Sequence, residues 1–284
     1  MLQAKVALPL SPEIITPVAI ILAALITASV TLFTQRRWLH SFLTRRSSFA
    51  ATARYQWLEE QSIVWALAGQ LKPETQRAIE VMRPFDPSGY RAIESALAKD
   101  DAVKIDSLVI TPDFQPTFSP VQLIVQGGTL PVAIRDIRAN IVTWQSPLSG
   151  TLIFGPPQGE EPVVEIAFDL DSNDTIARRL DDSGMPGKAY FADGFMTLQP
   201  SESMAFSIRA YTQEYYCEWE IEIDAVVRGK KRTLRVRDSD GRPFRTTAFA
   251  PSYDVMYELD FEQGRFVRMP PDSDVPWVVS YPAD

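Results

Sequence analysis

The sequence predicts a mainly-β protein, in which one transmembrane helix and a short helical neck precede a β-sandwich. The run from Ile14 to Phe33 is almost wholly apolar and long enough to span a bilayer core of about 30 Å. After Lys104 the apolar residues recur with a period of about 2 in place of about 3.6, which indicates strands. Pro or Gly interrupts much of that later chain at intervals of roughly eight to twelve residues, a spacing typical of a sandwich or barrel. The expected parts are an N-terminal segment (1–13), the transmembrane helix (14–35), a juxtamembrane helical region (36–104), an immunoglobulin-like sandwich (105–268) and a proline-rich acidic tail (269–284).

The residues that flank the apolar run predict its orientation. Only Lys5 precedes the run among basic residues, whereas the residues that follow it are strongly basic and include an aromatic anchor: Arg36, Arg37, Trp38, Arg45 and Arg46. Basic flanks stay on the cytoplasmic side, and Trp is enriched at the membrane interface. We therefore expect a single-pass protein of the plasma membrane with a cytoplasmic C-terminal domain and the lipid bilayer as one partner.

Helical spacing is predicted to continue past the membrane, because neither Gly nor Pro occurs between Pro17 and Gly69. An apolar column repeats every seven residues, at Leu43, Ala50, Trp57, Val64 and Leu71. The column that would pair with it in a coiled coil is half polar. We expect this helix to pack against the distal domain, and homo-oligomerisation through the helical region is the alternative.

Two shorter helices are expected next. One begins at Pro73 and ends before Pro84. The other is capped by Asp86, has Pro87 at its first position, and places Tyr90, Ile93 and Leu97 on one face.

Alternation of apolar residues predicts the strands of the distal domain. Val121, Leu123 and Val125 alternate before a turn at Gly127 and Gly128, and Val132 and Ile134 alternate after it. The pattern then shifts by one residue to Ile137, Ala139 and Ile141, which predicts a β-bulge near Arg135 and Asp136.

A hairpin is predicted around Arg228 and Gly229. Trp219, Ile221 and Ile223 would face the core, and the acidic residues between them would lie on the opposite face. A two-residue turn places Glu222 opposite Arg235 and Glu220 opposite Arg237. We expect this acidic face to be solvated and paired with arginines, in preference to a cation or substrate site.

The segment Leu198–Ile208, which reads LQPSESMAFSI, follows a Gly127-Gly128 turn and a bulged strand. It resembles the immunoglobulin-like sandwiches that occur as accessory domains in bacterial membrane-anchored proteins, in which a Leu-x-Pro-x-Glu turn precedes a strand of the second sheet. The resemblance covers Asp106 to Phe261. Members usually carry Gly where this chain has Ser201, and the acidic insertion from Asp169 to Asp193 is not typical. The resemblance implies binding or scaffolding and no catalytic residues.

Composition narrows the possible chemistry. The chain has one Cys, Cys217, and one His, His40, so the usual zinc sites and a Ser-His-Asp arrangement are not expected. The net charge is −8 and the acidic excess lies after Lys104, which argues against nucleic acid as a partner. The Asp169–Asp174 loop is rich in oxygen ligands but does not match an EF-hand. We expect no cofactor, no metal and no enzyme activity, and an enzyme using a carboxylate pair is a remote alternative.

The resulting hypothesis is a membrane-anchored scaffold whose cytoplasmic sandwich recruits another protein. Aromatic residues supply large contact areas, and the candidates for this contact are Tyr211, Tyr215, Tyr253 and Trp277. The alternative is a stress or antiviral effector that perturbs the bilayer when its cytoplasmic domains cluster.

Overall fold

A computed structural model describes residues 49–57, 63–81, 83, 86–107, 116–155, 166–181, 184–270 and 273. The chain divides into two compact units, Met1–Ser48 and Phe49–Asp284. The predicted transmembrane segment, its flanking residues Arg36, Arg37, Trp38, Arg45 and Arg46, and Trp277 in the tail all lie outside the described residues. Within the described residues, no helix has both the length and the hydropathy needed to cross a bilayer.

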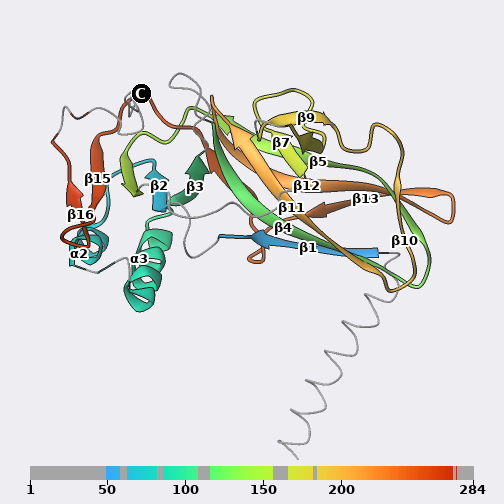
Figure 1. Cartoon of the computed structure of the whole chain (residues 1–284), viewed down its shortest axis with the longest axis horizontal. Helices are drawn as coiled ribbons and strands as arrows, with labels where there is room; N and C mark the ends of the chain where they lie inside the picture. The colour runs from blue at the N-terminus through green and yellow to red at the C-terminus, as the bar shows by residue number, and fades with distance from the viewer. Residues whose placement is uncertain are drawn as a thin grey trace, which may run out of the picture. The chain divides into compact units, whose positions relative to one another are not determined.

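The described part of the second unit is mainly β, with two sheets and two short helices (Figure 1). The larger sheet has eleven strands. Ten of them follow the order β16 (Arg265–Arg268), β15 (Val255–Asp260), β6 (Thr151–Gly155), β2 (Ile63–Leu67), β3 (Val103–Ser107), β4 (Thr117–Gly127), β11 (Ser203–Thr212), β7 (Ile166–Asp169), β8 (Arg178–Leu180) and β9 (Pro186–Ala189). The eleventh, β1 (Phe49–Tyr55), pairs antiparallel with β4.

The smaller sheet has five strands. Its order is β10 (Met196–Leu198), β5 (Val132–Gln145), β12 (Tyr216–Val227) and β13 (Lys230–Val236), and β14 (Phe244–Thr247) also pairs with β12. The largest core cluster contains residues of both sheets, for example Leu123 and Phe206 from the larger sheet and Ile134, Trp219 and Ile221 from the smaller one. The apolar faces that alternation predicted for these strands therefore pack into one core.

The helices α2 (Pro73–Val81) and α3 (Pro87–Lys99) cover one face of the larger sheet near β2, β15 and β16 (Figure 1). Ile79, Ile93 and Leu97 of these helices pack with Trp65 and Leu67 of β2. The alternate residues of β2 enter a different cluster on the opposite face of the sheet. β2 is thus buried on both faces, which explains its unbroken apolar sequence.

The prediction of a continuous helix from the membrane to Gly69 is wrong over β1 and β2. Residues 49–55 pair with β4, and residues 63–67 pair with β3 and β6. Leu71 lies outside any helix, so the seven-residue column from Leu43 to Leu71 does not form a helical stripe in the described residues. A short apolar run that is buried on both faces has no alternation, and periodicity alone does not distinguish it from a helix. β3 also crosses the expected boundary at Lys104 and pairs with both β2 and β4.

Other local predictions are confirmed. The helix α2 begins at Pro73, and Asp86 caps α3 with its carboxylate. The pairing of β5 with β12 shifts register where Asp224 faces Asp136 and Ala225 faces Ile134, which leaves Arg135 as the extra residue of a β-bulge. At the hairpin, Glu222 faces Arg235 as expected.

The turn between β10 and β11 places Ser201 in a conformation that favours glycine. Ser201 has a φ of 64°, a left-handed conformation that Gly adopts without steric cost. Its N–H donates to the carbonyl of Gly128 at 2.9 Å, and the N–H of Gly127 donates to the carbonyl of Glu202 at 2.8 Å. The turn is therefore tied to the end of β4. A Cβ at Gly127 would lie 2.6 Å from the carbonyl oxygen of Gln199, so only glycine fits there without a shift of the backbone.

Candidate protein-contact surface

Two of the predicted contact residues belong to the core. Tyr211 is 2% exposed and Tyr253 is 8% exposed. The Tyr211 ring packs against Phe118 at 5.2 Å between centroids, and its hydroxyl donates to the carbonyl of Gly184 at 2.9 Å. The Tyr253 hydroxyl accepts the N–H of Ala250 at 3.0 Å, and burial raises its pKa to about 12. Both rings are therefore buried in this structure and offer little surface to a partner.

Tyr215 is the predicted contact residue that the structure exposes, at 36%. It lies in the turn between β11 and β12, two residues before Cys217. The register of β5 and β12 places Trp144 opposite Cys217 and Thr143 opposite Glu218. Trp144 and Val142 are also half exposed. We define Trp144 and Tyr215, which lie at the adjoining ends of β5 and β12, as the end surface.

Hydrogen bonds hold the backbone around the end surface in place. The Trp144 indole Nε1 donates to the carbonyl of Leu170 at 3.0 Å. The two carboxylate oxygens of Asp171 accept, each at 2.6 Å, from the Thr212 hydroxyl and from the N–H of Gln213. The Tyr215 N–H in turn donates to the Thr212 Oγ1 at 3.2 Å. These bonds fix the turn that presents Tyr215 and the loop that supports Trp144.

The same bonds account for the oxygen-rich loop that begins at Asp169. The Asp169 carboxylate accepts the N–H of Asp171 at 3.2 Å, and Asp174 pairs with Arg178 at 3.2 Å. Burial is the main influence on the Asp171 carboxyl and raises its pKa, against the two hydrogen bonds that favour its charged form. The loop therefore uses its carboxylates to shape the backbone next to Trp144.

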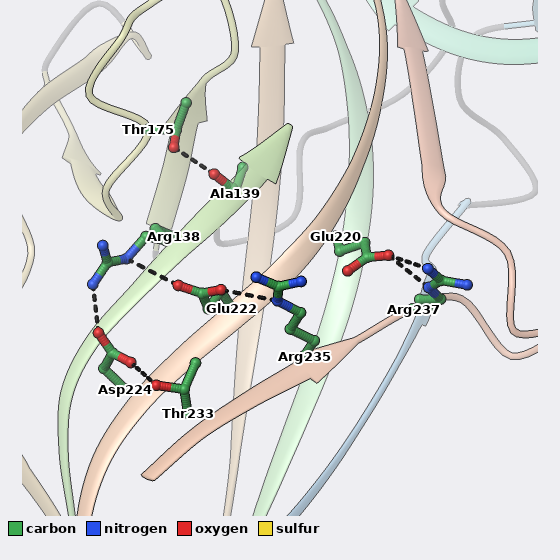
Figure 2. A network of polar contacts seen from close by, with 9 residues as sticks. All are labelled: Arg138, Ala139, Thr175, Glu220, Glu222, Asp224, Thr233, Arg235 and Arg237. Atoms are coloured by element: carbon green, nitrogen blue, oxygen red, sulfur yellow. Dashed lines mark hydrogen bonds and ion pairs between the residues drawn. The ribbon is translucent and has the colours of Figure 1, made fainter. Parts of the chain in front are cut away.

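The outward face of β12 carries a charge network, which Figure 2 shows. Glu222 lies between two arginines: its carboxylate is 3.1 Å from Arg235 Nε and 3.9 Å from Arg138 Nε. Arg138 also pairs with Asp224 at 2.5 Å, and the Thr233 hydroxyl donates to Asp224 at 2.6 Å. The pair of Glu222 and Arg235 is the one that the sequence predicted, whereas Arg138 of β5 is a partner that the sequence did not indicate.

Glu220 differs from the expectation of a solvated ladder. It pairs with Arg237 at 2.5 Å (Figure 2), but its side chain is only 5% exposed whereas that of Arg237 is 52% exposed. The carboxylate is thus buried beneath the guanidinium. The acidic face is a structural network in which each of these carboxylates already has a cationic partner.

Arrangement and burial determine whether the potential metal ligands and the thiol of the described residues meet the requirements of metal binding and thiol reactivity. Within them, no group of three or more His, Cys, Asp or Glu side chains is arranged to hold a metal ion. Cys217 is fully buried, and burial raises the pKa of its thiol to about 12. A thiol in this state is neither exposed nor ionised at neutral pH.

Sequence reasoning missed Trp144. Continued alternation from Ile137, Ala139 and Ile141 would place it on the outward face, but a second register shift leaves Val142 as an extra residue and puts Trp144 opposite the buried Cys217. No local pattern reveals this shift, because it depends on the pairing with β12.

Comparison of the chain with known protein families, curated proteins and solved structures found no match.

Proposed function

We propose that this protein is a single-pass, membrane-anchored scaffold whose immunoglobulin-like sandwich recruits a partner protein to the cytoplasmic face of the plasma membrane. The end surface is the observation that carries the proposal. It combines two exposed aromatic rings with hydrogen bonds that hold the surrounding chain in place.

The energetics of association favour such a surface. Trp and Tyr are enriched among the residues that dominate binding energy, and a surface ordered before binding loses less conformational entropy when the partner arrives. The charge network on β12 is a less favourable binding surface than the end surface, because a ligand there would have to displace existing ion pairs. Anchoring to a membrane then raises the effective concentration of the captured partner.

Cross-linking in intact cells, followed by purification from solubilised membranes, tests the proposal. We expect a protein captured by the wild-type chain to be lost when Trp144→Ala and Tyr215→Ala are combined. Phe195→Ala is the matched control, because Phe195 is an aromatic residue 54% exposed elsewhere on the smaller-sheet side of the chain, against Arg135. Equal capture by the double variant and the control would refute a role for the end surface.

A helix exchange separates the scaffold from the bilayer-perturbing effector. Ala24 and Ala28 form a small-xxx-small pair that lets transmembrane helices approach closely. A scaffold requires only localisation, so replacing residues 14–33 with an unrelated monomeric transmembrane helix of the same orientation should preserve the cellular phenotype. Loss of the phenotype at normal membrane levels would support the effector instead.

The cytoplasmic assignment has its own test. A reporter that is active only in the cytoplasm, fused after Asp284, should be functional, and a reporter that requires export should be silent at the same position. Activity of the exported reporter alone would overturn this part of the proposal.

A further inference from the structure

The hairpin that joins β12 to β13 ends in a cluster of cations. Its turn and the first residues of β13 are exposed and carry four basic side chains, which we call the basic tip: Arg228, Lys230, Lys231 and Arg232. None of these side chains forms an ion pair or a hydrogen bond with another described residue. The residues after Lys104 have an acidic excess, so the basic tip has a charge opposite to that of the domain that carries it.

The charge network on β12 ends before it reaches the basic tip. Further along the hairpin Glu222 pairs with Arg235 at 3.1 Å. The residues of β12 that face the cations of β13 are apolar: Ala225, Val226 and Val227. Asp224, the next residue along β12, faces Thr233 and already pairs with Arg138 at 2.5 Å. The register of the hairpin therefore places no carboxylate opposite the basic tip.

The basic tip lies at the end of the sandwich where the second unit begins. Val226 pairs with Ala133 at the start of β5, and β5 follows the turn after Gly127, the last residue of β4. Gly127 pairs in turn with Phe49, the first residue of the unit. Figure 1 shows the start of β1 and the hairpin of β12 and β13 at the same end of the two sheets.

We propose that the basic tip docks on the anionic lipid headgroups of the membrane that carries the chain. This inference rests on the membrane anchor of the proposed function. Residues 36–48 would join the expected transmembrane helix to Phe49, and a stretch of that length extends by at most about 45 Å. The end of the sandwich that contains Phe49 is therefore held near the bilayer. An anionic leaflet attracts Lys and Arg side chains within about one Debye length of its surface.

Docking at the basic tip would also orient the end surface. β12 has 12 residues, and at about 3.3 Å per residue its two ends lie about 40 Å apart. Trp144 and Tyr215 lie at the end of β12 opposite the tip, so docking directs them away from the bilayer, where a partner protein has access. A weak contact is sufficient, because tethering to the same membrane raises the effective concentration of the tip at the lipid surface.

Energy transfer from a fluorophore on the sandwich to an acceptor lipid tests the proposal with the full-length chain in liposomes. Thr129→Cys places the label in an exposed turn between β4 and β5, and the thiol of Cys217 is buried and does not compete for the label. We expect higher transfer in phosphatidylcholine mixed with phosphatidylglycerol than in phosphatidylcholine alone. The increase should vanish at about 1 M salt, which shortens the Debye length to about 3 Å.

A variant of the basic tip should lose this increase. Each Lys or Arg near an anionic surface favours docking roughly fivefold, so Lys230→Gln, Lys231→Gln and Arg232→Gln combined should weaken docking about a hundredfold. The matched control removes the same charge from exposed residues of α2 and α3, and combines Arg77→Gln, Arg91→Gln and Lys99→Gln. Protection of Cys217 from a disulfide reagent, measured without the label site, verifies that the tip variant is folded.

Three outcomes would overturn the proposal. They are equal transfer of the wild type in both liposomes, an undiminished increase in the folded tip variant, and loss of the increase in the control variant, which would assign it to net charge. Flotation with phosphatidylcholine liposomes separates this inference from the proposed function. A wild-type chain that does not float would refute the anchor and the docking together, whereas a chain that floats without lipid-dependent transfer would refute the docking alone.

Discussion

Replacement of Trp219 by alanine measures how much this side chain stabilises the core that the two sheets share. Trp219 is fully buried on β12. Its ring lies between Phe244, at 4.9 Å and 30°, and Phe168, at 5.8 Å and 77°. Its Nε1 donates to Thr246 Oγ1 at 3.1 Å, and the Thr246 hydroxyl retains a bond to Ser119 at 3.0 Å when the indole is removed.

The expected magnitude follows from the cavity. Removing a fully buried Trp costs about 3–5 kcal/mol, because neighbouring groups collapse only partly into the space. Two hydrogen-bonded sheets flank this site and resist collapse, which places Trp219→Ala toward the upper part of that range. The lost hydrogen bond adds little, because Thr246 keeps another partner. Trp219→Phe should cost less, because it leaves an aromatic ring between Phe168 and Phe244.

The single cysteine of the chain provides the assay. Cys217 lies two residues from Trp219, is fully buried, and has a thiol whose pKa burial raises to about 12. A disulfide reagent at pH 8 therefore labels it only when the core opens, and the labelling rate reports the free energy of opening. Trp219→Ala should accelerate labelling at least a hundredfold, since about 1.4 kcal/mol corresponds to a factor of ten.

Phe195→Ala is the control for the thiol assay, because Phe195 is 54% exposed and lies against Arg135, away from Cys217. It should cost at most about 1 kcal/mol. Labelling of Trp219→Ala at the rate of Phe195→Ala would show that the Trp219 ring does not support the core. Full reactivity of Cys217 in the wild-type protein would contradict its burial.

Three further predictions concern a turn, the charge network and ionisation. Ser201→Gly should raise the melting temperature, because relief of the φ of 64° outweighs the added chain entropy by up to about 1 kcal/mol. Glu222→Ala should lower the free energy of unfolding in urea by at most about 1 kcal/mol, since its partner Arg235 is exposed, whereas Glu220→Ala should cost more because its carboxylate is buried. Tyr253 keeps its proton in the folded state to about pH 12 but loses it near pH 10 when unfolded. Its contribution to stability is therefore present below pH 10 and lost as the pH rises to 12, and Tyr253→Phe should flatten that decline in urea titrations.

The strands of the shared core could be predicted from the sequence because one face of each is buried. Val121, Leu123 and Val125 alternate with polar or half-exposed residues on β4, and the shift after Ile134 identifies a bulge without knowledge of its partner strand. The alternation of apolar side chains along a strand does not depend on which strand pairs with it. The charge pairs followed from the turn at Gly229, since a two-residue turn fixes the register of both strands.

The strands β1 and β2 could not be recognised in the same way. β2 packs against helices on one face and a second apolar cluster on the other, so its alternation vanishes. The inward face of β1 includes the small residues Ala51 and Ala53, and its outward face includes Ala50, so the contrast between faces is weak. The absence of Gly and Pro then favoured a helix by propensity, and pairing with β4 overrode that preference.

The candidate sites also depend on tertiary structure that local sequence patterns do not reveal. Tyr215 and Tyr211 are both tyrosines near the end of β11, and only the tertiary arrangement decides which one solvent reaches. A cavity beside Lys104 joins Trp57, Trp65 and Arg245, which come from segments far apart in the sequence. No local pattern encodes that meeting, because it depends on how β1 and β3 align along the same edge of β4.

The polar features of the fold differ in whether they retain capacity to bind. On β12, Glu220 and Glu222 already accept from guanidinium groups, so an incoming ligand must first break an ion pair. At the end surface, hydrogen bonds to Trp144 and Tyr215 restrain the groups that carry the rings and leave apolar surface exposed. Binding is favoured where ordering was completed on folding and desolvation costs little, so recognition should reside at the end surface and not on the acidic face.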